Sequence, residues 1–292
     1  MKAIIFGSNG QDGFYLKQLL LENRIEVVTF SRNNADFIGD ISEYEIVFSL
    51  IGKFKPDYIF HFAATSTTKH DVILDNQKAI VNGTLNILES VRLIVPDCRI
   101  FISGSAMQFK NTGKPINEKT PFELSSAYSM QRWQSVLTSR YYIETFGLKI
   151  YIGYLFNHDS FLRSYSHVNR KIVGFVNSIS KGENGPFEIG NILVKKEFNY
   201  AGDVVNAIWQ FVNQNNLTEC VIGSGISYSI EDWVKICFEL SDLDYRKYIK
   251  INDLFVPEYN ELVSDPQLIK SIGWEPKCDI NELAFKMLNN KI

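Results

Sequence analysis

A tyrosine and an arginine four positions apart are the residues of this sequence best suited to chemistry. Tyr128 and Arg132 lie in a helical pattern over 126–146, where this spacing places both side chains on one face. Hydride transfer to a ketone needs a proton for the alkoxide that forms, and a phenol beside a cation can deliver it. Ser105, close after an apolar segment, can hold the carbonyl oxygen. We therefore predict Ser105, Tyr128 and Arg132 as catalytic residues, although Tyr128 alone could be a core contact.

A glycine-rich turn near the start of the chain is the second feature with chemical meaning. The apolar run Ala3–Phe6 is followed by Gly7, Gly10 and Gly13 and then by an amphipathic helical pattern. Strand, glycine turn and helix are the context of a dinucleotide-binding fingerprint. These glycines allow the tight turn, the approach of a pyrophosphate and close packing of the helix. The turn predicts a dinucleotide site that also includes Asn9, Gln11 and Asp12.

The residues after the other predicted strands complete the expected cofactor site. Ser31 and Arg32 follow the second strand, and no acidic residue stands there for the ribose of NAD. An arginine suits a 2′-phosphate, so we favour NADP(H) over NAD(H), which remains possible; a lone arginine can also be a solvated loop residue. Asp40, with Ile41, could place a carboxylate by the adenine or simply belong to a turn. Further cofactor contacts are expected from Phe62, Ala63, Ala64, Ser103, Tyr128, Arg132 and Leu155.

These residues need a scaffold, and strands alternate with helices through the first half of the chain. Beyond the first strand, short apolar segments predict strands at Glu26–Phe30, Asp57–Ala63, Arg99–Ser103 and Lys149–Leu155. Helical patterns at 43–54, 76–95 and 126–146 supply the crossovers that parallel strands require. The alternation predicts an α/β fold with a Rossmann-like, doubly wound parallel sheet, whose ligands bind at the carboxyl ends of the strands.

The pattern changes after Asn157, where glycines interrupt the chain. We expect helices at Val168–Lys181, Asp203–Asn213 and Ser229–Leu240, with strands at Phe187–Ile189 and Cys220–Ile222. This arrangement predicts a smaller C-terminal substrate lobe. We assign residues 1–157 and about 200–225 to a dinucleotide-binding domain, and residues 158–199 and 226–292 to the lobe.

Composition excludes several classes of function. The chain has 292 residues and a net charge of −3 without a basic block, which argues against nucleic acid as a partner. No apolar run approaches the ~20 residues of a membrane span, and a strand at the very start leaves no room for a signal peptide. The four cysteines are far apart, which predicts reduced thiols and no metal site. We therefore expect a cytoplasmic protein without membrane, nucleic-acid or metal partners.

Several motifs together resemble a known family. Gly7-x-x-Gly10-x-x-Gly13, Ser105 and Tyr128-x-x-x-Arg132 are similar to the extended short-chain dehydrogenases/reductases. More narrowly, the chain resembles the branch of GDP-mannose 4,6-dehydratase and GDP-4-keto-6-deoxymannose reductase. The motifs that carry this are Gly10-Gln11-Asp12-Gly13, Leu155-Phe156-Asn157-His158, Asn169-Arg170-Lys171-Ile172, Ile189-Gly190-Asn191 and Ile272-Gly273-Trp274-Glu275-Pro276-Lys277.

The resemblance implies a Rossmann-fold domain, a nicotinamide that the enzyme holds, and a lobe for a nucleotide sugar. It also implies a homodimer or homotetramer, packed through the helices over 77–93 and 129–145. The candidate substrate contacts are Ser66, Asn157, Arg163, Arg170, Lys171 and Lys196, of which each cation could equally be a surface charge.

The departures from this branch are as informative as the matches. Arg132 stands where the family has lysine, and the register Ser105, Ala106, Met107 puts methionine where dehydratases carry the glutamate that removes a proton beside the 4-keto group. A thioether cannot accept that proton. Other departures are Phe109-Lys110 for Tyr-Gly, Lys196-Glu197-Phe198 for Arg-Asp-Trp, and Val256 for a phosphate-binding arginine.

The chemistry that remains is oxidation or reduction at carbon 4. We therefore expect a 4-keto reductase or 4-dehydrogenase acting on a nucleotide sugar, with GDP as the favoured nucleotide. A 4,6-dehydratase whose base is displaced to Asp71, Glu118 or Glu123 is an alternative, and so is a C4 epimerase. A pseudoenzyme that binds a dinucleotide and regulates a partner is the non-enzymatic alternative.

Overall fold

A seven-stranded parallel sheet forms the centre of the computed structural model, which describes residues 1–179, 181–182, 185–252 and 254–292. The order across the sheet is β11-β6-β5-β4-β1-β2-β3, and every neighbouring pair is parallel. The strands are β1 (Lys2–Phe6), β2 (Glu26–Ser31), β3 (Phe37–Ile38), β4 (Tyr58–His61), β5 (Arg99–Ser105), β6 (Lys149–Leu155) and β11 (Glu219–Ile222). This confirms the predicted fold class. The strand order reverses between β1 and β4, so their carboxyl ends mark the place for a ligand.

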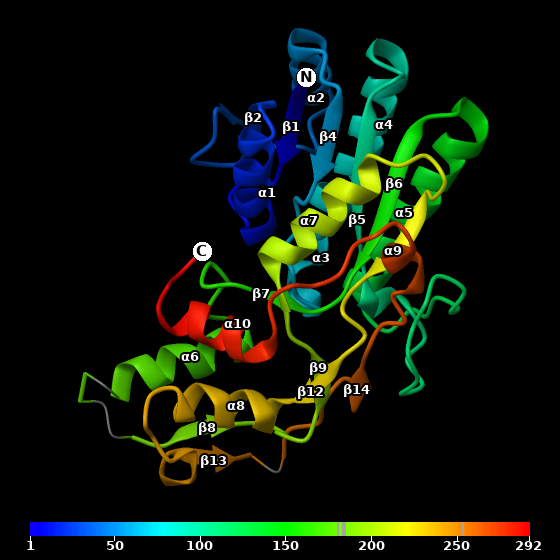
Figure 1. Ribbon diagram of the computed structural model, residues 1–292. Helices are drawn as coiled ribbons and strands as arrows, with labels where there is room; N and C mark the ends of the chain where they lie inside the picture. Colours follow the sequence, from blue (N-terminus) through cyan, green and yellow to red (C-terminus); the bar gives the residue numbers. More distant parts are fainter. Residues whose placement is uncertain (180, 183–184, 253) are drawn as a thin grey trace.

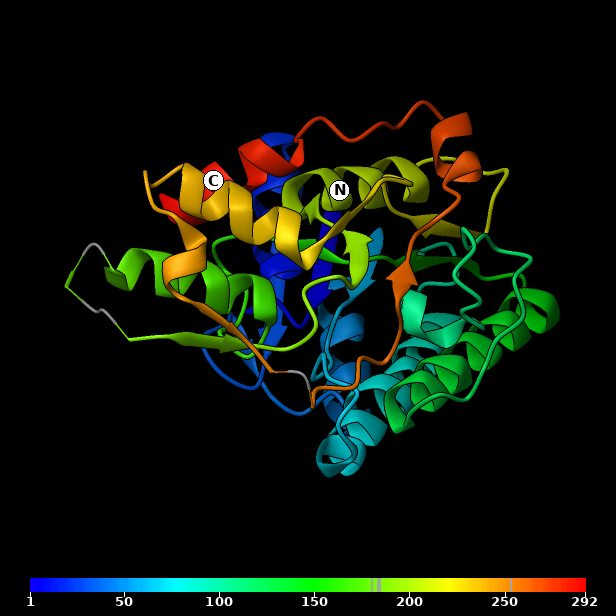
Figure 2. The same ribbon diagram turned by 90° about the horizontal axis from the view of Figure 1, so that it is seen from below.

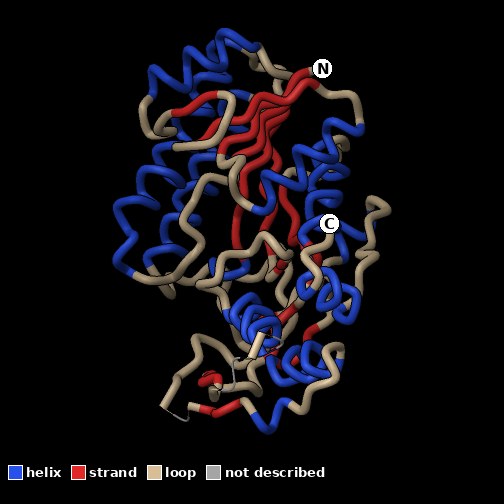
Figure 3. The backbone as a smooth tube through the Cα atoms, turned by 90° about the vertical axis from the view of Figure 1, so that its left-hand side faces the viewer, coloured by secondary structure: helices blue, strands red, loops and turns tan. Residues whose placement is uncertain are grey.

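Helices cover both faces of the sheet (Figures 1 and 3). One face packs against α1 (Gln11–Glu22), α7 (Ala201–Val212) and α9 (Gln267–Ser271), and the other against α2 (Tyr44–Phe54), α4 (Gly83–Ile94) and α5 (Ala127–Phe146). Side chains of β1 alternate between the two cores, with Ile4 and Phe6 on the α2 side and Ala3 and Ile5 on the α1 side. Burial on both faces explains why the strands are apolar throughout.

The predicted helix over 76–95 differs from the observed structure. It begins earlier, as η1 (His70–Val72) and α3 (Ile73–Asn76), and then winds as a π-helix in η2 (Gln77–Asn82) before α4. The Asn76 side chain accepts a hydrogen bond from Thr65 N at 2.8 Å and donates one to Thr65 O at 3.0 Å. These two hydrogen bonds connect the start of the helix to the loop after β4. The strand β4 ends at His61, two residues before the predicted end at Ala63.

The C-terminal lobe has its own core below the sheet (Figure 1) and lies away from α4 and α5 (Figure 2). Trp233 and Phe238 are buried there among three helices. These helices are α6 (Val168–Ile179), α8 (Ile230–Glu239) and α10 (Ile280–Leu288). The first of them was predicted to end at Lys181, which lies in a turn, and the predicted range includes Ser180, which lies outside the described residues. Ile269 and Trp274 are buried in the core between the sheet and helices α1 and α7. The segment around α9 therefore packs with the sheet and not with the lobe.

In the part of the chain that the structure describes, three small sheets lie in the lobe and at its junction with the main sheet. They are β7 (His158–Asp159) with β10 (Asn199–Tyr200), β8 (Phe187–Ile189) with β13 (Ile249–Ile251), and β9 (Lys195–Glu197) with β12 (Ser227–Ser229) and β14 (Glu261–Leu262). Two turns of 3-10 helix, η3 (Ala106–Gln108) and η4 (Tyr245–Lys247), complete the elements. Most of these strands were not predicted from the sequence, because two or three residues are too few to show an alternating pattern.

One buried carboxylate fastens three of these segments together. Glu197 is fully buried and accepts hydrogen bonds from the backbone N–H groups of Ser224 at 2.7 Å and Ser264 at 2.6 Å. It also accepts from Ser264 Oγ at 2.6 Å and from Asn199 Nδ2 at 2.8 Å. These donors lie in β10, after β11 and after β14, so this side chain fixes the lobe to the edge of the sheet.

No helix in the described part of the chain is long and apolar enough to cross a bilayer. Cys98, Cys220 and Cys237 are buried and Cys278 is half-buried, and all four are free thiols. Burial raises the pKa of the Cys98 and Cys237 thiols, which keeps them protonated and unreactive.

Candidate active site

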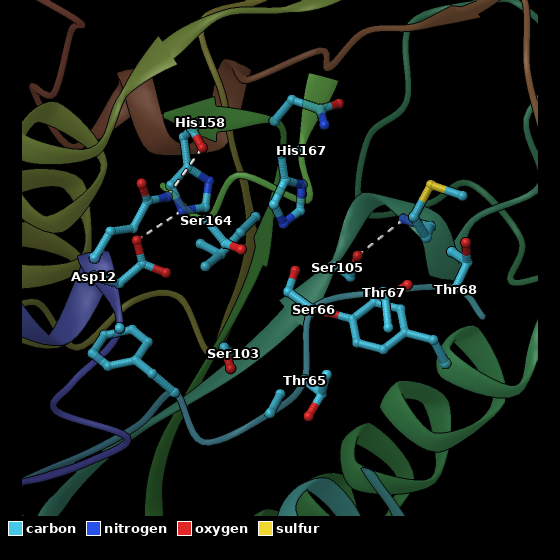
Figure 4. Close-up of a pocket in the computed structure, with 18 of the residues that line it drawn as sticks. Asp12, Thr65, Ser66, Thr67, Thr68, Ser103, Ser105, His158, Ser164 and His167 are labelled. Carbon is cyan, nitrogen blue, oxygen red and sulfur yellow. Dashed lines mark hydrogen bonds and ion pairs between the residues drawn. The ribbon is translucent and has the colours of Figure 1, made fainter. Parts of the chain in front are cut away.

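A cavity of about 810 Å³, here called the main cavity, opens between the carboxyl edge of the sheet and the lobe (Figure 4). The ends of β1, β4, β5 and β6 supply one wall, and Arg163 and His167 of the lobe supply another. A smaller hollow of about 370 Å³ adjoins it at Gly7 and Gly10 and extends to Arg32 and Asp40. Every residue predicted to touch the cofactor lines one of these two spaces, and the binding roles themselves stay predictions.

The glycine turn after β1 has the shape that a pyrophosphate requires. Gly7 has a φ of +85°, and a Cβ there would lie 2.6 Å from Ala63 N. A Cβ on Gly13 would lie 2.6 Å from Ser8 Cα, so only glycine allows α1 to pack this closely. Gly10 caps α1 without any side-chain hydrogen bond, which leaves N–H groups at the helix start for a ligand. The turn therefore fits the diphosphate of a dinucleotide.

The side chains of Gln11 and Asp12 line the main cavity and also contact the first residues of the lobe. Gln11 donates to His158 O at 3.1 Å and accepts from Ser160 Oγ at 3.0 Å, while Asp12 Oδ1 lies 2.8 Å from His158 Nε2. Burial alone would lower the pKa of His158, but the charge and hydrogen bond of Asp12 outweigh it and raise that pKa. The pKa of Asp12 is lowered in turn, because His158 outweighs the effect of burial. This pair joins the helix that begins at the glycine turn to the start of the lobe.

Tyr128 and Arg132 meet as their spacing predicts. Arg132 Nε donates a hydrogen bond to Tyr128 Oη at 3.1 Å, and both side chains are buried at the cavity wall. A second nitrogen of the guanidinium, Nη1, donates to Ser103 Oγ at 2.8 Å and to Ser103 O. Ser103 Oγ donates to His61 O at 2.9 Å. The phenol of Tyr128 therefore lines the cavity beside the guanidinium of Arg132, which hydrogen bonds to Ser103 of β5 hold in place.

Ser105 ends β5 at the same wall. Its Oγ accepts a hydrogen bond from Met107 N at 3.2 Å, so its own proton is free to be donated to a ligand. Gln108 returns the contact by accepting from Ser105 N at 2.7 Å, which completes a capping box around η3. Met107 follows in this turn and lines the cavity with its thioether. The wall beside the phenol thus offers a hydroxyl, and no carboxylate at position 107.

The small hollow is lined by two cations, Arg32 and Lys78, and by two carboxylates, Asp40 and Asp75. The Asp40 side chain accepts from Ser42 N at 2.9 Å and Ser42 Oγ at 2.8 Å. The backbone hydrogen bond from Ser42 lowers the pKa of Asp40, and the charges of Lys78 and Arg32 lower it further. A 2′-phosphate on the adenosine ribose fits these two cations, and Lys78 was not identified from the sequence.

A buried group of charges lies where the main cavity meets the lobe. Arg163 Nε is 3.3 Å from Asp159 Oδ1, and Asn169 Nδ2 donates to Asp159 Oδ2 at 2.6 Å. Burial and the charge of Arg163 lower the pKa of His167 to about 4, so His167 is neutral near pH 7. Burial lowers the pKa of Lys196 to about 8, against the opposing charge of Asp159.

The structure brings some of the predicted substrate residues together and not others. Ser66, Asn157 and Arg163 line the main cavity, and Asn157 Oδ1 has no hydrogen-bond partner within the described part of the chain. Lys196 lies behind this wall. Arg170 and Lys171 do not reach it. The Arg170 guanidinium instead donates to Met287 O and Asn290 Oδ1, each at 3.3 Å, and Lys171 is exposed. The buried face of α6 directs Arg170 toward the C-terminal helix, which the motif alone does not reveal.

The three carboxylates considered as displaced bases also separate. Asp71 lines the main cavity, whereas Glu123 lines only a neighbouring chamber. Glu118 accepts a hydrogen bond from Val221 N at 2.7 Å and is engaged in the fold. Sequence reasoning missed Glu258, which lines the cavity and bonds to Thr68, and it missed most of the hydroxyl-rich segment 65–68. The run of four hydroxyl residues, which begins four positions after the end of β4, was a signal that could have identified this segment.

Comparison with known proteins agrees with this geometry. The family model described as GDP-mannose 4,6 dehydratase matches residues 4–287. GDP-mannose 4,6 dehydratase 1 of Arabidopsis thaliana is 26% identical over 322 residues, which cover 99% of this chain and 89% of that protein. GDP-mannose 4,6-dehydratase of Vibrio cholerae is 26% identical over 344 residues, covering 98% of this chain and 92% of that protein.

Solved structures share the fold from end to end. RMD from Pseudomonas aeruginosa, complexed with NADPH, superposes with a TM-score of 0.87 at 17% identity, covering 99% of this chain and 98% of that one. The dTDP-glucose 4,6-dehydratase of Bacillus anthracis, in complex with NAD, gives a TM-score of 0.86 at 15% identity, with 99% and 96% covered. Because the family model spans nearly all of the sequence, the chain belongs to the GDP-mannose 4,6-dehydratase family of extended short-chain dehydrogenases/reductases.

Proposed function

We propose that the protein transfers a hydride between a nicotinamide cofactor and carbon 4 of a GDP-linked sugar, as a 4-keto reductase or, in reverse, a 4-dehydrogenase. The observation that carries this proposal is the pairing of Tyr128 and Ser105 at one cavity wall while Met107 takes the place of a carboxylate. Family membership supports the substrate class. The missing carboxylate favours redox chemistry alone over dehydration, because dehydration needs a further acid and base.

The residues of the chain divide the work at carbon 4. A bound nicotinamide would supply or accept the hydride. Ser105 would donate a hydrogen bond from its hydroxyl to the sugar oxygen, keep its own proton, and so hold the carbonyl. Tyr128 would deliver its Oη proton to the same oxygen as negative charge develops there, and Arg132 Nε, at 3.1 Å, would stabilise the phenolate that is left.

The cofactor would lie along the carboxyl edge of the sheet. The open N–H groups at the start of α1 would hold its diphosphate, and Ala63 and Ala64 leave room for it against the backbone. Arg32 and Lys78 in the small hollow favour NADP(H), with NAD(H) as the alternative.

The test is an assay of the turnover of GDP-4-keto-6-deoxymannose with NADPH, in which the loss of NADPH absorbance measures the rate. Tyr128→Phe should lower kcat by about 10²–10⁴-fold, the usual contribution of a general acid. Tyr141→Phe, on the exposed face of the same helix, is the matched control and should change little. No turnover of this or any other 4-keto sugar nucleotide by the wild type would reject the reductase, and a protein that also leaves GDP-mannose unchanged would be one that only binds dinucleotides.

A second candidate is a 4,6-dehydratase whose base is Asp71. Its supporting observations are the family itself and the place of Asp71 at the wall of the main cavity. This function predicts release of a 4-keto-6-deoxy product from GDP-mannose without net consumption of cofactor. Asp71→Asn should abolish that product, whereas Glu118→Gln, at a carboxylate outside the cavity, should not.

A further inference from the structure

A second chamber of about 610 Å³ continues the main cavity beyond Met107. The two spaces share six residues, Thr68, Ala106, Met107, Glu258, Tyr259 and Leu262. Figure 4 shows Ser105 and Thr68 on the opposite side of the main cavity from Asp12 and His158. The chamber is here called the side chamber. It begins next to Ser105, the serine that would hold the sugar oxygen, and extends away from Asp12 and His158.

Charge distinguishes the two spaces. The main cavity is lined by the cations Lys69, Arg132 and Arg163 and by the carboxylates Asp12, Asp71 and Glu258. Within the described residues no lysine, arginine or histidine lines the side chamber, while Glu123, Glu258 and Glu261 do. A phosphate group therefore meets cations in the main cavity, whereas the side chamber offers it carboxylates, which repel it. The nucleotide diphosphate of a substrate therefore belongs on the side of Arg163, and the side chamber is left for a part of the substrate that carries no negative charge.

The chemistry of the chamber wall describes that part. The thioether of Met107 and the ring of Phe109 offer apolar contact, and Asn111, Ser125 and Asn260 offer amide and hydroxyl groups. Ser125 Oγ makes only long contacts, at 3.4 Å, to Met107 O and Ser129 Oγ, so it can turn toward a ligand. A small neutral group with both carbon and hydrogen-bonding atoms fits such a wall.

We propose that the substrate carries such a group, larger than a methyl, on a ring carbon next to carbon 4, and that the side chamber receives it. This inference rests on the proposed function, because the reacting carbon is placed by Tyr128 and Ser105. With carbon 4 at these two residues and carbon 1 directed toward Arg163, a substituent on carbon 3 or carbon 5 is the one that reaches past Met107. Met107 then forms the entrance to the chamber and selects for the substituent.

The test compares three GDP-4-keto sugars, which carry a methyl at carbon 5, a hydroxyethyl at carbon 5, or an acetamido group at carbon 3. The wild type should prefer one of the two larger sugars over the methyl sugar by about tenfold or more in kcat/KM. One added group that fills a pocket usually changes kcat/KM by about this factor. The preferred sugar identifies the ring position. A wild type that prefers the methyl sugar over both overturns the inference.

Two variants narrow the chamber without touching the predicted catalytic residues. Thr112→Trp and Ser125→Trp each place a large ring at its exposed rim, and Lys114→Trp places the same ring at a neighbouring exposed position that does not line it. Narrowing should reduce kcat/KM for the larger sugar by about tenfold while the methyl sugar changes by less than about twofold. Equal loss for both sugars, or loss with Lys114→Trp, would contradict the role of the chamber.

A binding experiment separates this inference from the proposed function. The corresponding 4-hydroxy sugars cannot react with protein that holds NADPH, so calorimetry on that complex reports affinity alone. A larger sugar that binds about tenfold more tightly than the methyl sugar, and loses this advantage in Thr112→Trp, supports the chamber even where turnover is absent. Turnover without any difference in affinity or kcat/KM between the sugars supports the proposed function and rejects the chamber.

Discussion

Replacing Lys196 by methionine should make the protein more stable at neutral pH. Lys196 lies on β9 with only 8% of its surface exposed, and burial lowers its pKa to about 8 from an ordinary 10.5. Below pH 8 the lysine is charged in both the folded and the unfolded chain, so folding must bury the charge. Methionine has a similar length and no charge, and it removes this cost.

The size of the effect follows from the shift in pKa. The difference between 10.5 and about 8 is about 2.5 pH units, which corresponds to ~3 kcal/mol at about 1.4 kcal/mol per unit. Between pH 8 and 10.5 the unfolded chain keeps the proton that the folded chain has lost. Because the unfolded state then binds more protons, the wild-type free energy of unfolding gains a positive contribution as the pH rises through this range. The Lys196→Met variant lacks that contribution.

Urea denaturation of both proteins at intervals from pH 7 to pH 9.5 measures the difference. The variant should be more stable by ~3 kcal/mol at pH 7, and the gap should shrink to about 1 kcal/mol at pH 9.5. Lys195→Met, at the exposed neighbour on the same strand, is the control and should show no such convergence. A constant difference across this pH range would refute the reasoning. If Lys196 also attracts the substrate diphosphate, the more stable variant should bind GDP about tenfold more weakly.

Three further predictions test other parts of the structure. Arg32→Glu should lower the affinity for NADPH by about tenfold or more and spare NADH, because a carboxylate repels the 2′-phosphate; fluorescence titration with both cofactors measures this, and equal loss for both would contradict it. Glu197→Gln should lower the free energy of unfolding by ~3 kcal/mol, because the amide NH₂ of glutamine would face backbone N–H groups that now donate hydrogen bonds to the carboxylate. Urea denaturation measures this change. A change below about 1 kcal/mol would show that other contacts hold the lobe. The outer faces of α4 and α5 expose large apolar side chains: Leu85 is 47% exposed, Leu137 51% and Tyr141 55%. If an oligomer forms through these helices, Leu137→Glu should dissociate it. Light scattering of both proteins measures the mass, and a monomeric wild type would reject the expected dimer or tetramer.

The sequence predicted the parts of the fold whose signals are local. The glycine turn, the buried strands and the spacing of Tyr128 and Arg132 each depend on a few adjacent residues, and each has the predicted geometry. The strands of the lobe could not be predicted in this way. β9 pairs with β12 and β14 from distant parts of the chain, and Glu197 on this strand accepts hydrogen bonds from Ser224 and Ser264, which are also distant in sequence.

The substrate side of the site shows the same limit more sharply. Arg170 stands in a family motif and Arg163 in none of the motifs that carry the resemblance, yet only Arg163 of the two lines the cavity. Arg163 lies in the loop before α6, whereas Arg170 is on the buried face of that helix, which packs against α10, where Met287 O accepts a hydrogen bond from Arg170. A motif identifies which residues belong to a family, but tertiary packing decides which of them reach the ligand.

The departure at Arg132 can be understood from the same packing. A lysine ammonium is a single centre, whereas the guanidinium here uses two nitrogen atoms in different directions. Nε donates to Tyr128 Oη at 3.1 Å, and Nη1 donates to Ser103 Oγ at 2.8 Å. The planar fork therefore needs an acceptor behind it, and Ser103 supplies one with its hydroxyl and another with its carbonyl group. Arginine is compatible with the site because β5 carries a serine at position 103, so Arg132 and Ser103 act as one unit that keeps a positive charge beside the phenol.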